Sequence, residues 1–296
     1  MLVRRWVFAE EVKESLRRAG IAIAAAVSVV AVACGCGQTR PAGSERTVPA
    51  APAASGVSGN SSAGTVATAT YVPPRKPLLY GQRGSAVRSV QARLAQLHYY
   101  PGPVDGVYGQ DTQEAAWAFR EVQGLRVSTA TEAEPVTRAF EQALIHPRQP
   151  RVLISRGPAS RIEINKSIQV LVFYRNGKPS LITHTSTGGR YYYPCPGDPA
   201  ATCGPAVTPD GNFHALWFYN GWLTVPLGTM YNPVFFIGSA YAIHGDIPVP
   251  WYPVSHGCVR IWMDIAPWFH RQLVIGGAHA TPIYIRGSAP PYPDSN

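Results

Sequence analysis

The hydrophobic periodicity of the chain changes near residue 150, and this change limits the possible folds more than any other feature. Between residues 77 and 146, apolar residues recur every three to four positions, as on one face of an α-helix. From residue 151 to 287, apolar and polar residues alternate, which is typical of half-buried β-strands. The sequence therefore predicts an α+β multidomain protein, in which a small three-helix bundle precedes a mainly β domain.

The expected helices have recognisable ends. Ser85 is placed to cap the first helix, and Asp111 begins a capping box for the second. Gly124 stands where the second helix should stop, because glycine readily adopts a left-handed conformation. The third helix is expected over residues 134–144, with Pro135 in its first turn.

The second domain is expected to be mainly β, with long loops. Asn176-Gly177 is the strongest hairpin signal, and it predicts antiparallel strands over residues 168–174 and 181–186. Only residues 263–273 look helical. Further strand-like runs cover residues 224–225, 235–243 and 282–285.

Residues 1–36 have the layout of an export signal. Basic residues precede an apolar run over residues 20–33, which is shorter than the roughly 20 residues that a membrane span needs. Cys34 follows small residues, as at a lipoprotein processing site, and a plain secretory signal or an uncleaved anchor are the alternatives. All three place the body outside the cytoplasm, at the cell wall, on the outer membrane face or in the periplasm.

By composition, two further segments are not expected to pack into a core. Residues 37–76 are rich in Pro, Ala, Ser and Gly and predict a flexible, disordered linker, and residues 288–296 a flexible tail. The net charge is +9, which favours an anionic partner. Because no Lys/Arg run or aromatic-basic RNA motif is present, we expect a cell-surface polymer and no nucleic acid. The expected membrane contact is limited to a lipid on Cys34.

The five cysteines divide by position into the export region, a close pair and one isolated residue. Cys195 and Cys203 are expected to form a disulfide in an oxidising compartment, which leaves Cys258 as a free thiol. An unpaired thiol outside the cell indicates a chemical role.

Cys258 lies within a compact group of chemically active residues. Residues 255–260 read Ser-His-Gly-Cys-Val-Arg, and residues 244–245 read His-Gly. An imidazole and a guanidinium both favour the thiolate, which is the nucleophilic form of cysteine. The glycines allow close approach of a substrate, and the N–H groups of residues 256–258 are expected to form an oxyanion hole.

Two other interpretations of this group fit the residues less well. A zinc site made of His244, His256 and Cys258 lacks a fourth ligand and the usual Cys-x-x-Cys spacing. An inert core thiol does not suit polar, glycine-flanked surroundings. We expect no metal and no cofactor. Four other histidines are expected to be ordinary surface or core residues: His98, His184, His214 and His270.

Residues 244–260 closely resemble the signature of the L,D-transpeptidases of the YkuD type, and residues 188–189 and 208–211 also fit that family. The resemblance implies the L,D-transpeptidase fold, which is β-sandwich-like. It also implies that Cys258 attacks the carbonyl preceding the terminal D-alanine of a tetrapeptide stem, releases that alanine and forms a thioester. A side-chain amine of a second stem then completes a 3-3 crosslink.

The same resemblance assigns roles to neighbouring residues. His244 is the expected base, oriented by the carbonyl of Gly245, while Asp246 stays outside the catalytic set because the family uses a carbonyl there. The remaining expected site residues shape the oxyanion site or bind substrate: His256 and Gly257 for the oxyanion, and Arg260, Tyr231 and Ser255 for the substrate.

The helical region resembles the peptidoglycan-binding module of wall enzymes, chiefly in the turn over residues 104–109 and in Thr112. A helical spacer is the alternative. The implied partners are peptidoglycan stem peptides and glycan, with β-lactams such as carbapenems as covalent inhibitors. Two segments depart from the catalytic family pattern, residues 191–205 and 217–222, and we expect them to form a lid or an outer wall of the site.

Other functions remain open at this point. A wall-active L,D-carboxypeptidase or hydrolase uses the same thioester, and so does a transpeptidase that attaches a protein to peptidoglycan. Sortases have a longer His-to-Cys gap, and wall-lytic cysteine peptidases usually have Cys before His. A wall anchor with a dead site is disfavoured by the intact Cys258 and His244.

Overall fold

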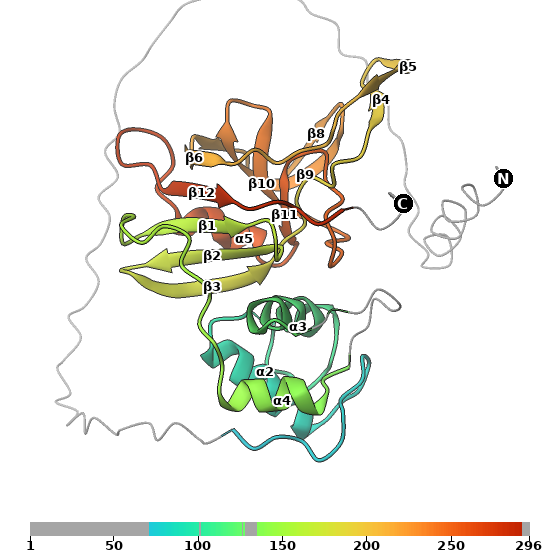
Figure 1. The fold of residues 1–296 in the computed structure, drawn as a ribbon, viewed down its shortest axis with the longest axis vertical. Coiled ribbons are helices and arrows are strands. Elements are labelled where there is room, and N and C mark those ends of the chain that lie inside the picture. The colour runs from blue at the N-terminus through green and yellow to red at the C-terminus, as the bar shows by residue number, and fades with distance from the viewer. Residues whose placement is uncertain (1–70, 101, 126, 128–134, 292–296) are drawn as a thin grey trace, which may run out of the picture. The chain divides into compact units, whose positions relative to one another are not determined.

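A computed structural model describes residues 71–100, 102–125, 127 and 135–291 (Figure 1). The export signal and Cys34 lie outside these residues, as does most of the expected linker. Within the described residues, no helix is both long and apolar enough to cross a membrane.

Three helices precede the β domain, as predicted: α2 (Ser85–Gln96), α3 (Gln110–Gln123) and α4 (Arg138–Ile145). Gly124 ends α3 in the left-handed conformation, with φ at 68°, which confirms the expected stop.

The starts of the helices differ from the prediction. Gly84 occupies the N-cap of α2, so Ser85 is its first residue and caps nothing. Gly109 likewise precedes α3, and the carboxylate of Asp111 accepts a hydrogen bond from the indole of Trp262. Helix α4 begins after Thr137, whose hydroxyl accepts from the N–H of Phe140, so Pro135 lies before the helix. Glycine has no side chain to accept the first N–H groups of a helix, so α2 and α3 begin without a side-chain cap. Residue preferences alone therefore placed these two helix starts wrongly.

The β domain contains two five-stranded sheets and one separate hairpin. The first sheet has the order β3-β2-β1-β12-β6, with β3 at Lys178–His184, β2 at Val170–Arg175, β1 at Arg161–Asn165, β12 at Pro282–Arg286 and β6 at Gly211–His214. The second has the order β11-β10-β9-β7, with β11 at Val259–Trp262, β10 at Tyr241–Asp246, β9 at Gly228–Ile237 and β7 at Trp217–Phe218. Strand β8 (Trp222–Val225) also pairs with β9.

The hydrophobic core of this domain is shared by the two sheets. Ile162 and Phe173 of the first sheet belong to the same buried cluster as Val234, Ile243 and Val259 of the second. Strands β1 and β2 are buried along almost their whole length, because the other face of the first sheet meets the helical bundle. The expected α+β architecture with a β-sandwich-like domain is confirmed.

The predicted hairpin is present, since Asn176 and Gly177 have φ values of 52° and 77° between β2 and β3. Residues 235–243 form parts of two strands, because the chain turns between β9 and β10. The segment 263–273 forms only the short helix α5 (Ala266–Phe269) and the 3-10 turn η1 (His270–Gln272).

Helix α3 packs against strand β3, so the helical bundle and the first sheet share a core (Figure 1). Phe119 of α3 belongs to the same buried cluster as Val172 of β2 and Ile182 of β3. The bundle therefore packs on the β domain through these side chains. The sequence pattern had placed them in separate elements and did not predict that the elements meet.

Candidate active site

A cavity of about 760 Å³ lies beside the end of β10 and the loop that precedes β11. One wall is the β8–β9 hairpin, and another comes from the hairpin of β4 (Tyr193–Cys195) and β5 (Asp198–Cys203). The predicted site residues that line the cavity are His244, Ser255, His256, Gly257, Cys258 and Arg260.

The pairing of two strands explains why these residues meet. Strands β10 and β11 are parallel neighbours, with Ile243 opposite Val259 and His244 opposite Arg260. Cys258 directly precedes β11, is half-buried and forms no disulfide. The intervening loop therefore brings the thiol to the strand that carries His244.

The Cys258 loop is held by two hydroxyl groups. Ser255 donates its hydroxyl to the carbonyl of Cys258 and accepts the N–H of Gly257 at 3.0 Å. Thr208 donates to the carbonyl of Gly257 at 2.7 Å. Because the N–H of Gly257 is already bonded, the expectation that three successive N–H groups form an oxyanion hole is wrong for this residue.

Gly257 is required by its surroundings. Its φ is +146°, and a Cβ atom there would lie 2.5 Å from the ring of Tyr241. Only glycine fits this combination of backbone conformation and close contact.

His244 is buried and oriented by the main chain. Its Nδ1 atom lies 3.0 Å from the carbonyl oxygen of Gly245, and since a carbonyl only accepts, Nδ1 carries the proton. The lone pair is then on Nε2. Burial, with help from the charge of Arg260, lowers the pKa of His244 to about 4, although the hydrogen bond to Gly245 raises it. The ring is therefore a neutral base near pH 7.

The electrostatics of Cys258 differ from the expectation. Burial raises the pKa of its thiol, and this effect outweighs the main-chain N–H of Ala242 and the charge of Arg260, which both lower it. The sequence predicted a thiolate because it contains the cationic Arg260 close to Cys258, whereas burial of the thiol depends on the folded structure. The resting pair is a neutral thiol and a neutral imidazole.

Arg260 already has an acidic neighbour. Its Nε lies 2.9 Å from Oδ2 of Asp246, although the Nε–H is not directed for a hydrogen bond. Asp246 also lines the cavity, and burial raises the pKa of its carboxyl despite Arg260. The resemblance leaves Asp246 outside the catalytic set. Its position directly after His244-Gly245 nevertheless indicated that it lies at the site.

Tyr231 does not line the cavity, contrary to the expectation. Its ring packs on Trp222, with 5.0 Å between ring centroids, and against the backbone of Gly245. Trp222 and Met230 form the wall in its place. Tyr231 packs against the core that the two sheets share, which residue spacing alone did not reveal.

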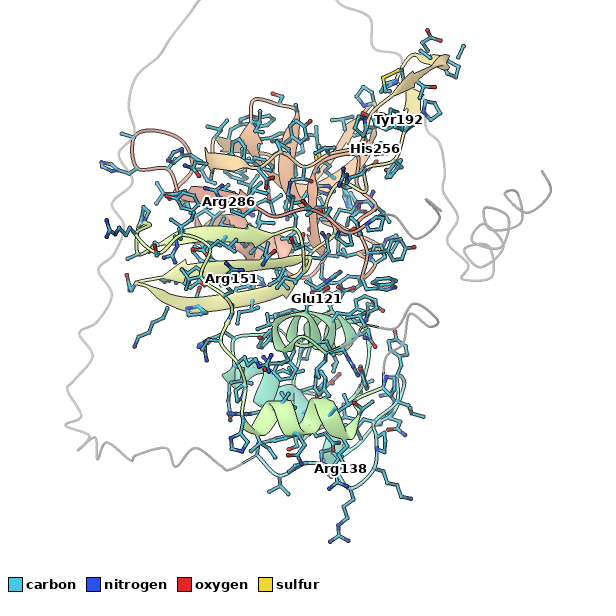
Figure 2. The ribbon with its side chains drawn as sticks, in the orientation of Figure 1. Glu121, Arg138, Arg151, Tyr192, His256 and Arg286 are labelled. Carbon is cyan, nitrogen blue, oxygen red and sulfur yellow. A yellow bond between two sulfur atoms is a disulfide. The ribbon has the colours of Figure 1, made fainter. Side chains whose placement is uncertain are left out.

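His256 is enclosed by aromatic rings from the segment that departs from the family pattern. The ring centroids of Tyr193 and Tyr191 lie 4.5 Å and 5.6 Å from that of His256, in edge-on arrangements. A disulfide joins Cys195 to Cys203 and closes the hairpin. Tyr193 and Pro196 of this segment line the cavity, so the segment forms an outer wall of the site; Figure 2 labels His256 and Tyr192, the residue that precedes β4.

His184 was expected to be ordinary and is not. It is buried beside Glu121 of α3, with 3.0 Å between Nδ1 and Oε1. No sequence motif marked it, because its partner lies 63 positions away. As for metals, the described residues contain no group of three or more His, Cys, Asp or Glu side chains arranged to hold an ion.

Two family models match the chain. Residues 83–129 match the peptidoglycan binding domain, and residues 159–285 match the L,D-transpeptidase catalytic domain. Both resemblances expected from the sequence are confirmed. None of the curated proteins matches.

Solved structures extend this similarity. The L,D-transpeptidase of Xylanimonas cellulosilytica, residues 123–326, is 31% identical with a TM-score of 0.62, and the match covers 72% of this chain and 100% of that one. An L,D-transpeptidase of Stackebrandtia nassauensis is 14% identical with a TM-score of 0.40, covering 73% and 98% of the two chains. One from Mycobacterium smegmatis is 18% identical with a TM-score of 0.34, covering 44% and 60%. The site, the family models and the identity over the whole Xylanimonas chain together show that this protein belongs to the L,D-transpeptidase family.

Proposed function

We propose that this transpeptidase forms 3-3 crosslinks in peptidoglycan through a thioester on Cys258. The observation that carries the proposal is the placement of a free thiol and an oriented, neutral imidazole at one cavity. The Nε2 atom of His244 is the only ring nitrogen left to accept a proton, because Nδ1 donates to Gly245.

In the first half-reaction, the thiol proton of Cys258 moves to Nε2 of His244 as the sulfur attacks the carbonyl preceding the terminal D-alanine. The carbonyl oxygen becomes an oxyanion, and the C–N bond then breaks. His244 returns the proton to the departing amine, so free D-alanine leaves and the thioester remains. A neutral Cys258 thiol and a neutral His244 imidazole suit this order of steps, because the proton is transferred during the attack and not before it.

In the second half-reaction, a side-chain amine from another stem attacks the thioester. The amine gives a proton to His244, the C–S bond breaks, and the thiol of Cys258 is restored by that proton. Arg260 is the proposed partner of a substrate carboxylate, and its contact with Asp246 holds the guanidinium at the cavity wall. Ser255 and Gly257 fix the loop that presents the sulfur.

The helical bundle supplies the proposed wall contact. Residues 83–129 belong to a peptidoglycan-binding family, and we propose that they bind the glycan or stem near the site of reaction. Export through residues 1–36, with lipid on Cys34, is the proposed route to the wall. Carbapenems are proposed covalent inhibitors, since their strained carbonyl is open to the same thiol.

Mass spectrometry of products from purified disaccharide-tetrapeptide tests the proposal. Wild-type protein should release D-alanine and form a dimer with the mass of a 3-3 crosslink, whereas Cys258→Ala should form neither an acyl-enzyme nor a dimer. Accumulation of tripeptide without dimer would favour the hydrolytic L,D-carboxypeptidase. Crosslinking by Cys258→Ala would refute the assigned nucleophile.

A further inference from the structure

Thr208 lies behind the loop that presents Cys258 and outside the wall of the active-site cavity. It is 1% exposed, whereas Gly257 and Cys258 line the cavity. Its side chain nevertheless contacts the loop directly, at the main-chain carbonyl next to the nucleophile. A buried hydroxyl in this place can act on the reaction only through the groups that it holds.

The hydroxyl of Thr208 makes two hydrogen bonds whose directions are fixed. Its Oγ1 accepts the N–H of Gly188 at 2.8 Å and lies 2.7 Å from the carbonyl oxygen of Gly257. Because a carbonyl oxygen only accepts, the single hydroxyl proton points to Gly257. The side chain therefore joins two main-chain groups and cannot rotate without losing both bonds.

The main chain of Thr208 is itself firmly held. Nζ of Lys166 donates to the carbonyl of Thr208 at 2.7 Å and pairs with Oδ1 of Asp210 at 3.1 Å. A Cβ atom on Gly188 would lie 2.6 Å from the main-chain nitrogen of Thr208, so these two segments are in close contact. The position of the hydroxyl is therefore set by its own surroundings and not by the Cys258 loop.

The bond from Thr208 also determines the direction of the Cys258 N–H. The peptide bond between Gly257 and Cys258 is trans. In a trans peptide the C=O and the following N–H lie in one rigid plane and point in opposite directions. The Cys258 N–H therefore points away from Thr208. Among the described residues none accepts this N–H, whereas the N–H of Gly257 is bonded to Ser255.

We propose that Thr208 is a positioning residue for acylation, which directs the N–H of Cys258 at the oxyanion by holding the carbonyl of Gly257. As the C–S bond forms, the electron pair of the C=O bond moves to oxygen, and a donor that is already aligned stabilises that charge without reorganisation. The role rests on the proposed function, but only on its first half-reaction. It is the same whether an amine or water later resolves the thioester.

Thr208→Val tests the role, because it removes the hydroxyl with little change in the shape of the side chain. Acylation by a carbapenem, followed by intact mass, should slow about 10- to 100-fold, since the Cys258 N–H is misdirected and not lost. With a tetrapeptide donor, kcat for release of D-alanine should fall while KM changes little. Thr208→Ser keeps the hydroxyl and should recover most of the rate.

Alkylation of Cys258 by iodoacetamide separates this role from a merely structural one. The sulfur displaces iodide from a saturated carbon, the iodide leaves with the electron pair of the C–I bond, and His244 takes the thiol proton. No oxyanion forms, so Thr208→Val should be alkylated at Cys258 at the wild-type rate. Alkylation that slows as much as acylation would show that Thr208 only holds the thiol in place, and would overturn the proposal. Unchanged acylation in Thr208→Val, or a serine variant as slow as the valine variant, would also overturn it.

Thr281→Val is the matched control. Thr281 is 6% exposed, and its Oγ1 accepts the N–H of Val274 at 2.9 Å, so it is a second buried threonine that bonds to the main chain outside the Cys258 loop. This variant should lose thermal stability and keep the wild-type acylation rate. Acylation as slow as in Thr208→Val would mean that general destabilisation is the cause, against the proposal.

Lys166→Met provides a second test if Thr208→Val does not fold. It releases the carbonyl of Thr208 and keeps the hydroxyl, so acylation should slow severalfold while alkylation of Cys258 stays at the wild-type rate. Equal slowing of both reactions, or of neither, would overturn the proposal. Wild-type protein that is alkylated at Cys258 but acylated by neither donor nor carbapenem would instead refute the proposed function, and the role of Thr208 with it.

Discussion

His184 of β3 and Glu121 of α3 form a buried ion pair between the β domain and the helical bundle, with 3.0 Å between Nδ1 and Oε1. Nε2 of the same ring donates to the carbonyl of Pro250 at 2.8 Å. Burial alone would lower the pKa of His184, but Glu121, with help from Glu114, raises it to about 9. Burial raises the pKa values of Glu121 and Glu114 to about 7, against the charge of His184.

Stability should therefore fall as the pH rises. All three groups bind protons more tightly in the folded protein than in the unfolded chain, so their contribution is fully present in acid and is lost as pH rises through about 7 and then about 9. The slope should be on the order of 1 kcal/mol in free energy of unfolding per pH unit.

Denaturant unfolding between pH 5 and 9 measures this slope. The double variant Glu121→Gln with His184→Gln removes two of the three titrations, and its stability should depend less on pH than that of the wild type. Identical slopes for the two proteins would show that the pair does not govern the pH dependence.

The low pKa of His244 predicts an acid-tolerant acylation. Because burial and Arg260 lower this pKa to about 4, the base stays neutral far below the ordinary histidine range. The rate of carbapenem adduct formation, followed by intact mass, should change little between pH 8 and 5 and fall by half near pH 4. In Arg260→Gln the acid limb should move to higher pH, whereas a wild-type limb near pH 6.5 would contradict the burial argument.

The disulfide hairpin should support His256. Strands β4 and β5 pair only with each other, and such an isolated hairpin is marginal without a crosslink. Replacing Cys195 and Cys203 by serine should increase hydrogen exchange over residues 193–203 and slow acylation severalfold, because Tyr193 no longer holds the imidazole.

Tyr193→Phe controls for this effect. It keeps the ring that meets His256 and should acylate at the wild-type rate, while Tyr193→Ala should resemble the serine double variant. Peptide mapping without reduction should also find Cys195 linked to Cys203. Two alkylated thiols in exported protein would exclude the disulfide.

Gly257→Ala should inactivate the enzyme. A Cβ atom would meet the ring of Tyr241 at 2.5 Å and the carbonyl of Val207 at 2.9 Å, in a backbone conformation that is strained for any side chain. Gly221→Ala is the matched control, because Gly221 also has positive φ (+99°) but has nothing within 4 Å of a Cβ. Gly257→Ala should lose more thermal stability and more of the carbapenem acylation rate than Gly221→Ala. Equal losses in the two variants would mean that backbone strain alone, and not the contact with Tyr241, causes the damage.

Local patterns in the sequence were sufficient for the order of the elements. Periodicity separated the helical region from the β region, Asn176-Gly177 located a hairpin, and Gly124 located a helix end. The grouping of Cys258 with His244 was also visible, because Cys258 directly precedes β11, which pairs with the strand β10 that carries His244. Each of these signals depends on residues close together in the chain.

The environment of the site was decided by tertiary structure. Whether Cys258 is a thiol or a thiolate depends on how deeply it is buried. Tyr231 packs against the core between the sheets, and Trp222 lines the cavity. The pairing of His184 with Glu121 joins two domains across 63 positions. The sequence by itself determined which reactive groups the protein carries, whereas only the folded chain decided their charge and direction, because desolvation and contact depend on neighbours that are distant in the sequence.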